Sequence, residues 1–67
     1  MPLVTIKLAN PPITTEQKGR LIEAVTQAVA DIAGKDPKAV NVIIEEVDPD
    51  NWGVGGESLT MRRNKIK

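Results

Sequence analysis

Polar and apolar residues alternate at the start of the chain, which reads MPLVTIKL. Every second residue from Val4 to Leu8 is apolar, and Thr5 and Lys7 stand between them. A period of two with β-branched enrichment is typical of a strand that buries one face. The pattern therefore predicts a strand over residues 2–8.

A helical period replaces this alternation after two consecutive prolines, which cannot join a strand ladder. Thr14 or Thr15 can serve as the N-cap, and Thr14 with Gln17 three residues later fits a capping box. Gly34 follows the last apolar residue and suits a left-handed C-terminal cap. These signals predict a helix over residues 16–33, with one apolar stripe formed by Leu21, Ile22, Val25, Ala28, Val29 and Ile32.

A second strand is predicted over residues 40–47, after the turn signal Asp36-Pro37. Its alternation places Val40, Val42 and Ile44 on one face. Asn41, Ile43 and Glu45 lie on the other face. The order strand, helix, strand implies a right-handed crossover between two parallel strands, an α/β (α+β) fold in β-α-β order. One helix covers only one sheet face, so we expect the other face and the sheet edge to pack against further copies of the chain.

The segment DPDNWGVGGES, residues 48–58, is predicted to form a short hairpin or tight loop because three glycines follow the tryptophan. A phosphate-binding loop is disfavoured, since no helical pattern follows and the Gly-Lys-Ser/Thr ending is absent. Trp52 is the single aromatic residue of the chain. It can belong to the core or to an interface, or it can wall a binding site, and both readings agree at a subunit junction.

Composition limits the possible classes. With 67 residues and no cysteine, the chain forms one domain (1–67), and it buries only about 60% of its unfolded surface when alone. The formal net charge of zero argues against a nucleic-acid partner. No membrane span, signal peptide or metal-ligand cluster is visible, so we expect no membrane, metal or cofactor, and a cytoplasmic location.

Basic residues gather at the C-terminus, where Arg62, Arg63, Lys65 and Lys67 occupy four of the last six positions. Such a tail is expected to be solvated, and residues 64–67 are expected to be flexible. Contact with a neighbouring subunit or an anionic ligand is the alternative.

Pro2 is the residue that offers chemistry. It can simply begin a strand, where its missing N–H is tolerated. A small residue at position 2 also favours removal of the initiator methionine, which would leave a free secondary amine. The reference pKa of an α-amino group is roughly 7.7–8.0, and an apolar pocket would lower it. Pro2 could then be a general base in a chain without histidine or cysteine.

The order of these features resembles the tautomerase superfamily, and most closely the short 4-oxalocrotonate tautomerase family. The shared features are an amino-terminal proline on a strand, TEQK at the start of the helix, a second strand that ends in acidic residues, and WGVGGE in a hairpin. The resemblance implies β-α-β protomers that pair into dimers, commonly three dimers in a homo-hexamer. It also implies that Pro2 is the catalytic base acting on enol or keto acids, with Trp52 in place of the phenylalanine that usually walls the pocket.

Two arginines of that family are missing. The segment before the helix reads Asn10-Pro11-Pro12 where the family has an arginine that binds a substrate carboxylate, and Asn41 occupies the place of an arginine in the second strand. Asn41 can donate a hydrogen bond to a substrate oxygen but supplies no charge, or it can be a solvent-facing residue at a strand edge. Lys7, Arg62 and Arg63 are the other cations considered for the site.

The sequence therefore predicts an isomerase, a tautomerase of 2-oxo acids that handles monoanionic or aromatic enols, such as a phenylpyruvate enol, better than dianions. Two alternatives stay open. One is an inactive or supporting subunit of a hetero-oligomeric tautomerase. The other is a Pro2-dependent hydratase, dehalogenase or decarboxylase. Glu45 and Glu46 are not expected to act as a pair in such chemistry, because adjacent strand residues point to opposite faces.

Overall fold

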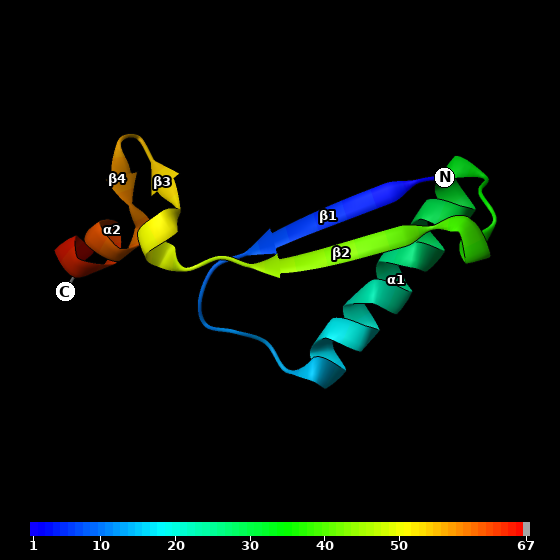
Figure 1. The fold of residues 1–67 in the computed structure, drawn as a ribbon, viewed down its shortest axis with the longest axis horizontal. Helices are drawn as coiled ribbons and strands as arrows, with labels where there is room; N and C mark the ends of the chain where they lie inside the picture. The colour runs from blue at the N-terminus through cyan, green and yellow to red at the C-terminus, as the bar shows by residue number, and fades with distance from the viewer. Residues whose placement is uncertain (67) are drawn as a thin grey trace.

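The computed structural model describes residues 1–66 of the chain, which form a β-α-β unit followed by a small C-terminal unit (Figure 1). The predicted α/β fold class is confirmed. The elements in chain order are β1 (Leu3–Leu8), α1 (Thr15–Ala33), the short 3₁₀ helix η1 (Pro37–Ala39), β2 (Asn41–Glu46), the 3₁₀ helix η2 (Pro49–Asn51), β3 (Gly53–Val54), β4 (Glu57–Ser58) and α2 (Leu59–Ile66).

The strands β1 and β2 are parallel and pair in register from Leu3 opposite Asn41 to Leu8 opposite Glu46. Helix α1 lies across one face of this two-stranded sheet (Figure 1). The strand residues on the helix side are half-buried, except Glu46, which is exposed. The strand residues on the other face are all exposed. The half-buried set consists of Val4, Ile6, Leu8, Val42 and Ile44.

Both predicted caps of α1 are present. The Thr14 side chain accepts a hydrogen bond from the Gln17 N–H (3.0 Å), and the Gln17 side chain accepts one from the Thr14 N–H (2.8 Å), which completes the capping box. Gly34 at the C-terminal end has φ 66° and ψ 39°, the left-handed conformation that glycine adopts at little cost. The N–H of Lys35 then donates to the Ala30 carbonyl at 3.1 Å, which fixes the start of the turn towards β2.

The C-terminal unit contains the predicted hairpin and a helix that was not predicted. Gly55 and Gly56, both with positive φ, connect β3 to β4. The expectation that no helix follows the glycines is wrong, because α2 begins directly after β4. Its sequence, LTMRRNKI, carries no apolar stripe. Two hydrogen bonds hold the helix instead. The Ser58 side chain accepts one from the Met61 N–H at 3.1 Å, and the Thr60 hydroxyl donates the other to the Asp50 carboxylate.

The last residues were expected to be flexible. Residues 64–66 form the last turn of α2, and Lys67 lies outside the described residues. Flexibility of this tail stays a prediction.

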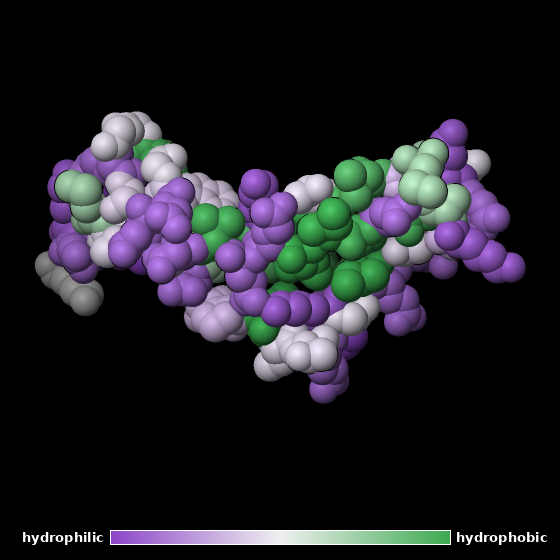
Figure 2. All heavy atoms as spheres, viewed as in Figure 1, coloured by the Kyte–Doolittle hydropathy of each residue, from purple (hydrophilic) through white to green (hydrophobic). Residues whose placement is uncertain are grey.

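The protomer does not enclose a core of its own. Its radius of gyration is 15.3 Å, whereas a compact domain of this length has about 11 Å. Its accessible surface is 5126 Å², against about 4,200 Å² for a compact monomer of this mass. Within residues 1–65, none of the aliphatic, methionine or tryptophan side chains is fully buried, and Figure 2 shows a broad apolar area over the middle of the molecule. Further burial of this apolar surface would require another chain.

The uncovered sheet face carries exposed apolar residues. Leu3 is 60% exposed and Ile43 is 47% exposed, although both lie on strands. A sheet with a bare apolar face and an unpaired edge is a typical site of association between chains. This agrees with the expectation that copies of the chain complete the core.

Glu46 ties the end of β2 to the start of α1. Its carboxylate pairs with the Lys18 ammonium at 2.5 Å and accepts a hydrogen bond from the Ile13 N–H at 3.2 Å. The hydrogen bond from Lys18 is the main cause that holds the pKa of Glu46 below its ordinary value; partial desolvation acts in the opposite direction.

We expect the Glu46 contacts to stabilise the fold at neutral pH and to fail in acid. Since the folded pKa is lowered, the stabilisation is present above the unfolded pKa of roughly 4.3 and is lost as pH falls through the folded value. Glu46→Gln should lower the melting temperature at pH 7, and the difference from the wild type should shrink towards pH 3. Glu45→Gln is the control, because its ion pair with Lys7 is longer, at 3.8 Å. A difference that does not change with pH would contradict this account.

Candidate active site

Pro2 stands at the open end of β1. Its carbonyl accepts a hydrogen bond from the Asn41 N–H at 2.9 Å, which extends the β1–β2 ladder by one residue. Pro2 therefore lies beside the first residue of β2. The alternation of burial places it on the helix side, with Val4. Met1 is 98% exposed and is accessible to a processing enzyme. While Met1 is attached, the Pro2 nitrogen is part of an amide. Removal of Met1 produces the secondary amine.

Asn41 lies at the same end of the sheet as Pro2. Its side chain belongs to the exposed face, and its amide Nδ2 donates to the Ala39 carbonyl at 3.1 Å. The amide is therefore held by a local contact in the protomer and lies across the sheet from the helix side. The structure brings Pro2 and Asn41 to one end, on opposite faces.

Trp52 lies at the other end of the protomer. It follows η2 at the exit of β2, its side chain is half-buried, and its carbonyl accepts a hydrogen bond from the Leu59 N–H at 2.8 Å. The length of β1 separates the two ends by about 20 Å. Pro2 and Trp52 of the same chain therefore do not meet, and a pocket that contains both requires two chains.

The cations considered from the sequence are also remote from Pro2 within the protomer. Lys7 pairs with Glu45 on the uncovered face of the sheet. Arg63 donates from Nη2 to the Asn10 carbonyl at 3.0 Å, at the end where Trp52 lies, and Arg62 belongs to the same helix. These side chains could reach a Pro2 only if it belongs to a neighbouring copy.

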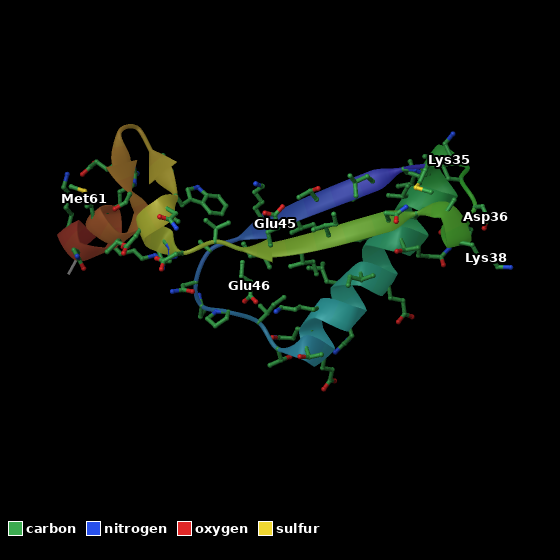
Figure 3. All side chains as sticks on the ribbon, in the orientation of Figure 1. Lys35, Asp36, Lys38, Glu45, Glu46 and Met61 are labelled. Carbon is green, nitrogen blue, oxygen red and sulfur yellow. The ribbon has the colours of Figure 1, made fainter. Side chains whose placement is uncertain are left out.

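The two strand carboxylates do not form a pair. Glu45 contacts Lys7, whereas Glu46 contacts Lys18 of α1, and Figure 3 shows the two side chains on opposite sides of β2. The expectation from strand alternation is confirmed. A water-activating carboxylate pair is therefore absent at this place.

Sequence reasoning missed two cations at the Pro2 end, Lys35 and Lys38. In Figure 3 they lie, with Asp36, at the end of the molecule where Figure 1 marks the N-terminus. The signal was available: in a parallel β-α-β unit, the segment between the helix and the second strand must return to the start of the first strand. The turn before β2 therefore belongs beside Pro2.

Comparison with known proteins gives the family. The family model described as "Tautomerase enzyme" matches residues 2–62 of the chain. The chain belongs to the tautomerase family. Family membership makes it a tautomerase and hence an isomerase, as predicted.

Individual relatives match over nearly the whole chain. The chain is 51% identical over 65 residues to a probable tautomerase K2 of Dickeya dadantii, covering 97% of both chains. It is 40% identical over 60 residues to the 2-hydroxymuconate tautomerase of Bacillus subtilis, covering 90% of this chain and 95% of that protein.

A heterohexameric 4-oxalocrotonate tautomerase from Chloroflexus aurantiacus has the same fold, with a TM-score of 0.79 at 37% identity, and covers 90% of this chain and 95% of that chain. The resemblance to 4-oxalocrotonate tautomerases is thereby confirmed.

Within residues 1–66, no group of three or more histidine, cysteine, aspartate or glutamate side chains is arranged to hold a metal ion. No helix in that range combines the length and the apolar composition needed to cross a membrane.

Proposed function

We propose that the protein interconverts enol and keto forms of a 2-oxo acid, with the secondary amine of Pro2 as the general base. The observation that carries the proposal is the position of Pro2 at the start of β1, directly after an almost fully exposed Met1, in a chain of the tautomerase family. The chain contains no histidine or cysteine to serve instead.

The proton transfer needs one group that can accept and return a proton. The neutral amine of Pro2 takes the proton from the enol hydroxyl, and the C–O bond becomes a carbonyl while the electron pair of the C=C bond takes a proton at carbon from the prolinium. The amine is neutral again at the end of the cycle. A positioned general base of this kind contributes roughly 10²–10⁴ in rate.

The pocket is proposed to form between chains. Trp52 of a neighbouring copy would wall it, exclude water and stack on a planar substrate. Because Pro2 and Asn41 of one chain lie on opposite faces of the sheet, the Asn41 of a neighbouring copy would donate a hydrogen bond to the substrate oxygen, after exchanging its present bond to Ala39. The bare sheet face and the distance between the two ends support an assembly of at least a dimer, and we propose a homo-hexamer built from three dimers.

The proposed substrate is a monocarboxylate enol with an apolar or aromatic remainder. Asn41 offers a neutral donor, and charge-assisted hydrogen bonds are roughly twice as strong as neutral ones. We therefore expect kcat/KM for phenylpyruvate enol to exceed that for 2-hydroxymuconate by about tenfold. Both ketonisation rates are measured by ultraviolet absorbance, with protein whose intact mass establishes the loss of Met1. Faster turnover of the dianion would contradict this substrate class.

A second candidate is a supporting subunit in a hetero-oligomer. The Chloroflexus aurantiacus neighbour is described as a heterohexamer, which makes this arrangement relevant to the family. The chain would then contribute Trp52 and pocket walls, while a partner contributes the chemistry. Purifying the chain alone decides between them: a stable homo-oligomer with Pro2-dependent activity excludes the need for a partner, whereas an inactive or unassembled chain favours the supporting role.

A further inference from the structure

Lysines of the protomer fall into two groups according to the end of the sheet. Lys18 at the start of α1 and Lys7 near the end of β1 are paired with carboxylates, as is Lys65 in α2. These three lie towards the end that also carries Trp52. Within residues 1–66, the lysines without an ion pair are Lys35 and Lys38, and both precede β2, at the end that carries Pro2.

The turn that contains Lys35 is fixed next to the start of β1. Helix α1 ends at Gly34, and the Lys35 N–H is bonded to the Ala30 carbonyl at 3.1 Å, so the side chain leaves from an ordered turn. The chain then enters β2, whose first residue bonds to the Pro2 carbonyl. Figure 3 shows Lys35 at the end of the molecule where Figure 1 marks the N-terminus, the end that carries Pro2.

Lys38 is less suited to a role beside Pro2. It belongs to η1, its N–H donates to the Asp36 carboxylate at 3.0 Å, and in Figure 3 it lies further along the turn from the N-terminal end of β1 than Lys35 does. Asp36 is the one acidic residue of this turn, and it caps η1 without an ion pair to either lysine. The turn therefore retains net positive charge.

We propose that Lys35 binds the carboxylate of the substrate in the same protomer whose Pro2 performs the proton transfer. This proposal rests on the proposed function and assigns the substrate-binding cation of that site. An ammonium with three donors can hold one carboxylate, which agrees with a monoanionic substrate. A single charge at this place orients the 2-oxo group towards Pro2, at the start of β1.

The experiment compares an acid with its neutral analogue. Ketonisation of phenylpyruvate enol and of its methyl ester enol is measured with the wild type, Lys35→Met, Lys35→Arg and Lys38→Met. Arg20→Met is the matched control, since it removes one charge on the solvent side of α1, about 20 Å along the helix from Ala33. Melting temperature and native mass are recorded for every variant, because Lys35 at a helix C-terminus also complements the helix dipole.

The expected result is a change in KM for the acid alone. Lys35→Met should raise KM for the acid by about tenfold, with kcat within about twofold and the ester unaffected. Lys35→Arg should retain most of the binding, and Arg20→Met should behave as the wild type. Equal effects on acid and ester, or a larger KM effect in Lys38→Met, would overturn the assignment. If neither substrate shows Pro2-dependent turnover, the proposed function itself fails, which is a different outcome.

Discussion

Pro2→Ala is expected to reduce the ketonisation rate of a phenylpyruvate enol by about 10²- to 10³-fold. Removal of Met1 from this variant leaves a primary amine on the same backbone atom, without the ring that fixes its orientation, so the base is weakened rather than abolished. The ladder bond from the Asn41 N–H to the carbonyl of residue 2 involves backbone atoms alone. The fold and the assembly should therefore be retained.

The measurement is kcat/KM for the variant and the wild type, each with an intact mass that establishes loss of Met1. Native mass and melting temperature serve as controls for assembly and folding. A Pro2→Ala protein that is correctly assembled and as active as the wild type would contradict the role given to the secondary amine of Pro2.

Ile43→Lys is expected to dissociate the assembly and to lower activity with it. Ile43 is 47% exposed in the protomer and lies on the uncovered sheet face with Leu3. A lysine at this position would bring an unpaired charge into an apolar interface, which is strongly unfavourable. Because Pro2 and Trp52 of one chain lie at opposite ends, loss of assembly should lower kcat/KM by about tenfold or more.

Ala24→Lys is the matched control, since it adds the same charge at an exposed position on the solvent side of α1. Native mass and kcat/KM are measured for both variants over a range of protein concentrations. An Ile43→Lys protein that is monomeric and fully active would contradict a site shared between chains.

The local signals of the sequence were sufficient for the β-α-β unit. Alternation at Val4 to Leu8, the capping box at Thr14 and the glycine at position 34 each act through neighbouring residues, and each is confirmed in the structure. Helix α2 could not be read from periodicity, because no apolar stripe marks it and its N-terminus depends on the Ser58 side chain and on packing against η2.

The candidate site was predictable in kind but not in arrangement. Pro2 and Trp52 are singled out by their residue type, yet their positions at opposite ends follow from the parallel pairing of β1 and β2. The same pairing places Lys35 at the Pro2 end, which was not recognised from the charge pattern. The partner chain that would join the two ends is a property of the assembly and leaves no local signal in the sequence.

The most direct test of the central proposal is the titration of the Pro2 amine, followed by nitrogen NMR in the assembled protein after removal of Met1. The account predicts a pKa for the Pro2 amine below the reference range of roughly 7.7–8.0, so that the neutral amine is available at neutral pH. It also predicts that the ketonisation rate rises with pH and that the midpoint of this rise equals the same pKa. An amine that titrates at or above that range, or a rate that does not follow its titration, would contradict Pro2 as the general base.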